Sequence, residues 1–131
     1  MYLSIGKMMA AVLQILVVDD SEVVRKAICK ILQSLPELQI VCEASDGSAA
    51  VTLARQHRPD LVLMDISMPG TNGLEATRLI KHELPKTKII ILSQHRSGVF
   101  MREAIAAGAD GFAAKDAREL IAEVRKIQSL T

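Results

Sequence analysis

The sequence predicts a doubly wound α/β fold, in which a five-stranded parallel sheet carries helices on both faces. Short apolar runs of strand length alternate with longer stretches in which apolar residues recur every three or four positions. Five such pairs share 131 residues, enough for one well-buried core but not for two domains. Alternating strands and helices imply parallel pairing through right-handed crossovers. In sheets of this kind ligands bind beyond the carboxyl ends of the strands.

The first strand and helix show the two patterns clearly. Residues 13–18 form a continuous apolar run, as expected for a strand covered on both faces. Residues 24–35 carry apolar side chains at helical spacing, with basic and polar residues between them. Pro36 is expected to stop this helix, because proline lacks the amide hydrogen that the helix needs.

The next three elements follow in the same alternation. Residues 38–44 read as a second strand, Asp46-Gly47 as a turn, and residues 48–57 as a small-residue helix. Pro59-Asp60 then turns the chain into a third strand over residues 61–64.

The second half repeats this order. A helix is predicted over residues 74–84 and a fourth strand over residues 88–92. They are followed by a helix over residues 98–107, a short strand over 111–114 and a last helix from 117 to about 127.

Composition excludes several kinds of protein. Sixteen basic and fifteen acidic residues give a formal charge of +1, and no basic cluster could follow a nucleic-acid backbone, so this chain itself is not expected to bind DNA. Cys29 and Cys42 suggest neither a disulfide nor a metal site, and we expect buried, reduced thiols in a cytoplasmic protein. Residues 1–12 read as a leader without a membrane span or signal peptide.

Four of the five predicted strands are followed by residues that handle phosphate or metal. The first strand runs into Asp19-Asp20, the third into Asp65, the fourth into Ser93 and the fifth into Lys115. Each has a plain structural alternative: a helix cap for Asp20, a turn for Asp65 or a solvated charge for Lys115. These structural alternatives together would require four independent coincidences at one edge of the sheet. A shared functional site explains all four positions at once and is the better interpretation.

Charge indicates what that site would hold. Three carboxylates carry about −3 and Lys115 contributes +1, so one divalent cation would bring the cluster to about zero. Oxygen ligands with room for water suit Mg²⁺, which also neutralises phosphoryl oxygens. Asp65 would then be the nucleophile in a Mg²⁺-assisted phosphoryl transfer.

Four stretches together resemble a known family. They are ILVVDDS at residues 15–21, DISMPGTNG at 65–73, the strand ending in Ser93, and GADGFAAK at 108–115. In combination they resemble the receiver domain of two-component response regulators, and residues 13–131 are assigned to that domain. The Pro69-Gly70 loop and the Lys115-Asp116-Ala117 ending are most similar to the LuxR-type transcription regulators.

The resemblance implies a flavodoxin-like (βα)₅ sandwich with strand order 2-1-3-4-5. It also implies that Asp65 accepts a phosphoryl group from a sensor histidine kinase, and that the chain catalyses only its own phosphorylation and dephosphorylation. Asp19, Asp20, Asp65 and the backbone carbonyl of Ser67 would hold Mg²⁺.

The remaining roles implied by the resemblance concern signal output. Lys115 and the Ser93 hydroxyl would contact phosphoryl oxygens, and Phe112 would turn inward as Ser93 moves, although an ordinary core aromatic is an equal alternative for Phe112. A homodimer would form through the 98–107 helix, the fifth strand and the last helix. Gln94 stands where the family has a small residue and is followed by His95 and Arg96, and this bulk is expected to affect the rates of phosphotransfer and hydrolysis.

Four interpretations are weighed for the whole protein. The chain is either a stand-alone receiver or the receiver part of a regulator whose DNA-binding effector domain lies outside it. A small-molecule phosphatase would want a carboxylate where Ser67 stands. A phosphorylation-independent binding module would be expected to have lost Asp19, Asp20, Asp65 or Lys115.

Overall fold

A computed structural model describes residues 12–66, 73–93 and 98–130 of the chain. The predicted leader, apart from Val12, lies outside the described residues. So do Ser67, Gln94 and His95, for which the structure provides no test.

Strands and helices alternate strictly along the described residues. The strands are β1 (Leu13–Val18), β2 (Leu38–Ala44), β3 (Leu61–Asp65), β4 (Lys88–Leu92) and β5 (Gly111–Ala113). The helices are α2 (Glu22–Gln33), α3 (Gly47–His57), α4 (Gly73–Glu83), α5 (Gly98–Ala107) and α6 (Ala117–Ser129). All neighbouring strands pair in parallel, in the order β2-β1-β3-β4-β5, which confirms the predicted topology.

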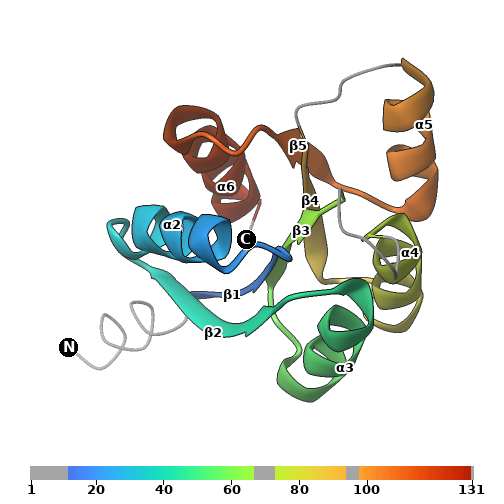
Figure 1. Cartoon of the computed structure of the whole chain (residues 1–131), viewed down its shortest axis with the longest axis horizontal. Coiled ribbons are helices and arrows are strands. Elements are labelled where there is room, and N and C mark those ends of the chain that lie inside the picture. Colours follow the sequence, from blue (N-terminus) through green and yellow to red (C-terminus); the bar gives the residue numbers. More distant parts are fainter. Residues whose placement is uncertain (1–11, 67–72, 94–97, 131) are drawn as a thin grey trace.

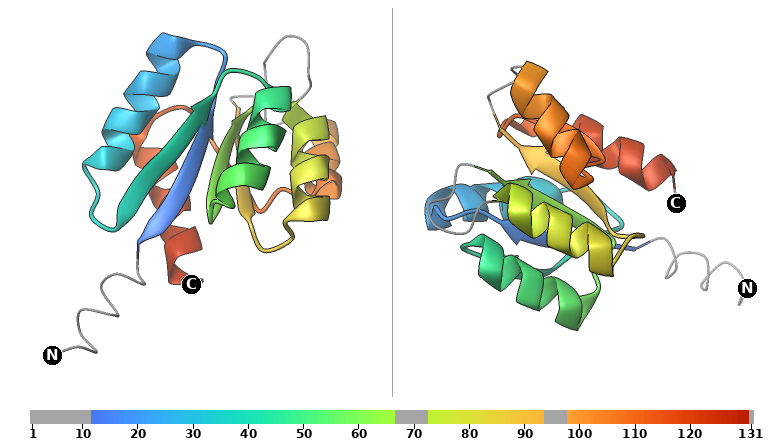
Figure 2. Two further views of the ribbon diagram at one scale, coloured as in Figure 1. Left: turned by 90° about the horizontal axis from the view of Figure 1, so that it is seen from below. Right: turned by 90° about the vertical axis from the view of Figure 1, so that its right-hand side faces the viewer.

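Helices cover both faces of the sheet (Figure 1). Helices α2 and α6 lie on one face, and α3, α4 and α5 lie on the other, as the two further views in Figure 2 also show. Successive residues of a strand point to opposite faces, so each strand supplies both cores. In β3, Leu63 packs toward α2 and α6, whereas Met64 packs toward the opposite helices.

The edge strand β2 differs from the central strands. Strands β1, β3 and β4 have almost fully buried apolar residues, as parallel strands covered on both faces require. Most of β2 is only half-buried because it has one strand neighbour. Cys29 is buried as predicted, but Cys42 in β2 is only half-buried, so that part of the prediction was wrong.

Side-chain caps set the starts of three helices more sharply than hydrophobic spacing could. Ser21, Asp46 and Asp116 accept hydrogen bonds from the first-turn amides of α2, α3 and α6. The predicted Asp46-Gly47 turn is therefore a cap followed by the first helical residue. The predicted end at Pro36 was also wrong: α2 ends at Gln33, and Ser34 caps it.

Three smaller differences concern element ends. β3 includes Asp65, β5 ends at Ala113 and α6 continues to Ser129. Among the described helices, none combines the length and apolar character that a bilayer crossing requires.

Candidate functional site

Acidic side chains gather at the carboxyl edge of the sheet. The parallel register places Val18 of β1 beside Met64 of β3, so the residues that follow, Asp19 and Asp65, come level at the ends of the two strands. Carboxylate oxygens of Asp19, Asp20 and Asp65 all lie within 4.8 Å of one another. The structure therefore brings together the three carboxylates that the sequence analysis singled out.

Asp19 is held by the turn between β1 and α2. Its backbone amide donates to the Ala44 carbonyl of β2 at 3.0 Å, and its Oδ1 accepts from the Ser21 amide at 2.9 Å. Ser21 in turn caps α2 through Val24. A helix cap was the structural alternative for Asp20, but Ser21 forms that cap. Asp20 is left exposed at the rim of the acidic cluster.

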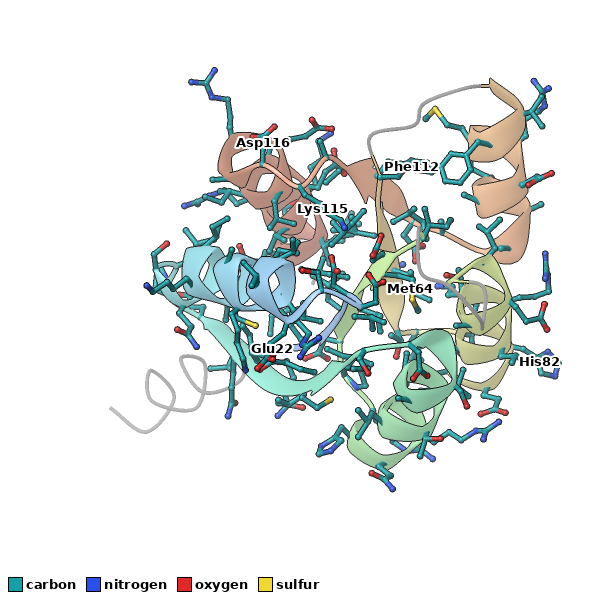
Figure 3. The ribbon with its side chains drawn as sticks, viewed as in Figure 1. Glu22, Met64, His82, Phe112, Lys115 and Asp116 are labelled. Atoms are coloured by element: carbon teal, nitrogen blue, oxygen red, sulfur yellow. The ribbon has the colours of Figure 1, made fainter. Side chains whose placement is uncertain are left out.

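Lys115 joins the two buried carboxylates. Its Nζ lies 2.8 Å from Asp19 Oδ2 and 3.3 Å from Asp65 Oδ1. Figure 3 shows the Lys115 side chain reaching from the segment after β5 toward the ends of the central strands. Burial lowers the pKa of Lys115, but the nearby negative charges of the Asp19 and Asp65 carboxylates outweigh burial, so its pKa is raised above 10.5. Lys115 is therefore an ammonium at neutral pH.

The donor set fits a hard divalent cation. Asp19 and Asp65 are 0% and 1% exposed, yet the cluster with Asp20 and Lys115 has a formal charge of about −2. Asp19 Oδ2 accepts no well-aligned hydrogen bond among the described residues, although the Lys115 ammonium is close. Buried oxygens with uncompensated negative charge are the ligands that Mg²⁺ and Ca²⁺ take in proteins. Asp19, Asp20 and Asp65 are the residues that would hold such an ion.

The start of α4 presses against the backbone of Asp65. A Cβ atom on Gly73 would lie 2.7 Å from the Asp65 carbonyl oxygen and 3.2 Å from Ile66 Cα. Only glycine allows this close approach of two backbones. The predicted helix over residues 74–84 left Gly73 outside, and its role was missed because only the contact in space shows it.

Ser93 lies next to the acidic cluster, directly after β4. Leu92, the residue before it, is level with Asp65 in the strand register. Ser93 is buried, and its amide donates to the Ala113 carbonyl at 3.0 Å. This backbone bond fixes the end of β4 against β5. A role of the Ser93 hydroxyl toward a phosphoryl group stays a prediction.

Phe112 on β5 is half-buried and packs on the face covered by α3, α4 and α5. Figure 3 shows Phe112 on the side of β5 that faces α5. In this structure it is a core aromatic at the margin of the sheet, and its role as a switch stays a prediction.

Arg25 and Glu43 border the site and were missed. Arg25 lies among the basic and polar residues of the first predicted helix, and no role was predicted for Glu43. In the structure Arg25 donates to the backbone oxygen of Asp19, and Glu43 accepts from Arg25. Glu43 is the one charged residue of β2, and this was the signal that could have indicated the contact.

Known proteins with related sequences are signalling regulators. The chain is 40% identical over 119 residues to the response regulator UvrY of Escherichia coli, covering 89% of this chain and 55% of that protein. It is 37% identical over 117 residues to the transcriptional regulatory protein DegU of Brevibacillus brevis, covering 88% and 50%. The chain therefore spans about half the length of these curated relatives.

Solved structures give the same assignment. A LuxR-family two-component response regulator from Aurantimonas matches with a TM-score of 0.85 and 34% identity, over 90% of this chain and 86% of that one. The response regulator domain of CheB from Thermotoga maritima matches with a TM-score of 0.81 and 33% identity, over 90% and 97%. The family model of the response regulator receiver domain matches residues 15–125. The chain thus belongs to the receiver domains of two-component response regulators.

Proposed function

We propose that Asp65 is the phosphoacceptor of this receiver domain and that Mg²⁺ is its metal. The observation that carries the proposal is the position of Asp65: a buried carboxylate at a strand end, with an ammonium 3.3 Å away and two further carboxylates in contact range. A structural ion pair needs one carboxylate for one ammonium. Two additional carboxylates add repulsion that only a cation would offset.

The chemistry is a displacement at phosphorus. An oxygen of the Asp65 carboxylate attacks the phosphoryl group of a phosphohistidine on a sensor kinase, the P–N bond breaks, and the imidazole leaves with its electron pair and takes up a proton. When bound, Mg²⁺ supplies charge neutralisation to the phosphoryl oxygens and to the three carboxylates.

Two residues of the chain act around that displacement. The Lys115 ammonium, already beside Asp65, pairs with a phosphoryl oxygen, and the Ser93 hydroxyl donates to another. The chain is not an enzyme for other substrates, because it provides only its own side chain as acceptor. In dephosphorylation, water attacks the phosphorus, the bond between phosphorus and the Asp65 oxygen breaks, and inorganic phosphate leaves.

The signal that phosphorylation produces is a change of charge at the buried carboxyl edge of the sheet. Phosphorylation replaces one negative charge on Asp65 with about −1.5 to −2. Ser93 and Lys115 follow the new charge, and Phe112 adjusts on β5. A homodimer through α5, β5 and α6 would report that change, and the 61% and 59% exposure of Val99 and Ile105 on α5 supports an apolar contact there.

The wider context rests on the relatives. A sensor histidine kinase in the cytoplasm supplies the phosphoryl group. UvrY is named a response regulator and DegU a transcriptional regulatory protein, and the match to this chain covers 55% and 50% of their lengths. We therefore propose that this receiver controls a DNA-binding effector domain. DNA is then contacted through that effector and not through the receiver, and no membrane contact is needed.

The test is phosphoryl uptake measured by intact mass. The protein is incubated with acetyl phosphate and MgCl₂ and analysed in acid, which preserves an acyl phosphate. We expect a gain of one phosphoryl group that requires Mg²⁺ and is absent from Asp65→Ala. A matched control is Asp60→Ala, which removes a carboxylate at the opposite edge of the sheet. Uptake by Asp65→Ala, or none by the wild type, would contradict the proposal.

A further inference from the structure

We propose that Arg25 is a positioning residue for the metal site, acting through the peptide that joins Asp19 to Asp20. This inference rests on the proposed function, because it concerns the affinity of the same acidic cluster for Mg²⁺. Arg25 is not a ligand and touches no reacting atom. It holds the backbone from which two of the carboxylates project.

The contacts of Arg25 make a bridge between three elements. From α2, its Nη1 donates to the backbone oxygen of Asp19 at 2.7 Å, and its Nε donates to Glu43 Oε1 on β2 at 3.0 Å. The side chain is only 14% exposed, so water competes little for these bonds. One guanidinium thus ties the end of β1 to both α2 and the edge strand.

The bonded oxygen is well placed to matter. It belongs to the planar peptide between Asp19 and Asp20, so fixing the oxygen fixes the plane and the direction in which the chain leaves toward Asp20. The Asp19 carboxylate has a second restraint, the amide of Ser21 at 2.9 Å. Within the described part of the chain, the Asp20 side chain makes no hydrogen bond or ion pair of its own. The backbone therefore sets where the Asp20 carboxylate points.

Arginine suits this task better than lysine. Its guanidinium is planar and presents several N–H donors in a fixed arrangement, so Nε and Nη1 can serve two acceptors at once. A lysine at position 25 would keep the charge but would lose the rigid two-point bridge. The comparison of Arg25→Lys with Arg25→Met therefore separates geometry from charge.

Charge alone predicts the opposite result. A positive side chain beside the acidic cluster disfavours the binding of Mg²⁺. If Arg25 acted only through its charge, Arg25→Met would therefore bind Mg²⁺ more tightly than the wild type. A positioning role means that Arg25→Met and Arg25→Lys both bind Mg²⁺ more weakly. The sign of the change distinguishes the two.

Lys26 offers a matched control. Its Nζ donates to Glu43 Oε2 at 2.8 Å, on the same carboxylate that holds Arg25, but it makes no contact with Asp19. Lys26→Gln removes one ion pair of Glu43 and leaves the bond to the Asp19 oxygen in place. Glu43→Gln serves as a second variant, because it loosens Arg25 without removing it.

The experiment is a MgCl₂ titration of uniformly ¹⁵N-labelled protein, followed by the amide shifts of the Asp19 region. We expect the Kd for Mg²⁺ to rise about tenfold in both Arg25→Lys and Arg25→Met, as for other residues that orient metal ligands. Glu43→Gln should show a smaller rise and Lys26→Gln none. With Mg²⁺ at saturation, phosphoryl uptake by both Arg25 variants should return to near the wild-type level.

The outcomes separate two failures. Wild-type Kd values in both Arg25 variants, tighter binding in Arg25→Met, or wild-type binding in Arg25→Lys alone would overturn the positioning role while leaving the proposed function standing. A wild-type protein whose amide shifts do not respond to Mg²⁺ would overturn the metal site itself. Thermal melting in EDTA shows which variants are folded. If Arg25→Met is not folded, the Kd of Glu43→Gln is used in its place.

Discussion

The two edges of the sheet treat their polar side chains in opposite ways. At the amino edge, Asp110, Lys81 and Thr87 form a hydrogen-bonded network: Asp110 Oδ2 accepts from the Ile89 amide at 2.9 Å and from Lys81 Nζ at 3.1 Å. Lys81 also donates to the Thr87 carbonyl at 2.9 Å, and the Thr87 hydroxyl donates to the Pro59 carbonyl at 2.8 Å. These bonds fasten loops to strands, and they are what a structural network requires.

At the carboxyl edge, the described residues carry an excess of negative charge. Lys115 contacts Asp19 and Asp65, and Asp20 adds a third carboxylate to the same cluster. Burying carboxylates in excess costs stability. The polar side chains of the amino edge therefore stabilise the fold. Those of the carboxyl edge lower its stability and form a site that a cation and a phosphoryl group can complete.

The largest stability effect is expected from Lys115→Met. It leaves buried Asp19 without its cation, and removing one partner of a buried pair is strongly destabilising. We expect the free energy of unfolding in EDTA to fall by about 2 to 4 kcal/mol. Adding MgCl₂ should restore part of it, since a ligand that binds only the folded state stabilises that state. Urea unfolding with and without MgCl₂ measures both effects.

Lys126→Met is the control for that variant. Lys126 is 71% exposed and pairs with Glu123 at 2.9 Å, so its loss should change the unfolding free energy by less than about 1 kcal/mol. If Lys115→Met and Lys126→Met changed the free energy of unfolding equally, the excess negative charge at the carboxyl edge would not destabilise the fold.

Gly73→Ala should disturb the site through the backbone. The added methyl group meets the Asp65 carbonyl at 2.7 Å, so α4 or the end of β3 must shift. We expect a loss of about 1 to 3 kcal/mol in stability and slower phosphoryl uptake by the folded protein. Gly98→Ala is the control, because its methyl group would meet only the end of Arg102 at 3.4 Å. Unchanged uptake in Gly73→Ala would show that this contact does not position Asp65.

Asp110→Ala tests the amino edge. It removes the acceptor of the Ile89 amide and the partner of Lys81, and should lower the free energy of unfolding by about 1 to 2 kcal/mol. Phosphoryl uptake by the folded fraction should stay at the wild-type level. Reduced phosphoryl uptake by fully folded Asp110→Ala would contradict the claim that the amino edge serves stability and not phosphorylation.

The smallest effect is a pH-dependent one at Glu43. The hydrogen bond from Lys26, assisted by the one from Arg25, holds the pKa of Glu43 below its ordinary value of 4.5 although burial acts in the other direction. Because the folded-state pKa is lowered, the stabilisation is present above pH 4.5 and is lost as pH falls through the lower folded value. Wild type should exceed Glu43→Gln by less than about 1 kcal/mol at pH 7.

That difference should shrink as the pH is lowered below 4.5, in urea unfolding of both proteins side by side. A difference that does not vary with pH would show that the Glu43 charge contributes nothing through its partners.

Much of this could be predicted from the sequence, because apolar runs determine the sheet and the sheet determines which residues meet. Asp65 is the last residue of β3, and Asp19 and Lys115 lie just beyond the ends of β1 and β5, so parallel pairing alone brings them to one edge. Helix ends were less certain, since Ser21 and Ser34 set α2 through hydrogen bonds that hydrophobic spacing does not report.

Contacts between polar side chains on different elements could not be predicted. Arg25 and Glu43 are 18 positions apart, and Lys81 and Asp110 are 29 apart, so the local sequence around one residue does not identify its partner. Gly73 is similar, because its need for glycine arises from a backbone carbonyl on another element. Such pairs depend on distances that only the folded structure supplies.

The central claim is that the phosphoryl group forms a bond to Asp65, and borohydride trapping tests it most directly. The protein is phosphorylated with acetyl phosphate and MgCl₂, reduced with sodium borohydride, digested and sequenced by mass spectrometry. An acyl phosphate is reduced to an alcohol, so we predict homoserine at position 65 and unaltered Asp19 and Asp20. Homoserine at position 19 or 20, or at no position in protein that has gained a phosphoryl group, would contradict the account.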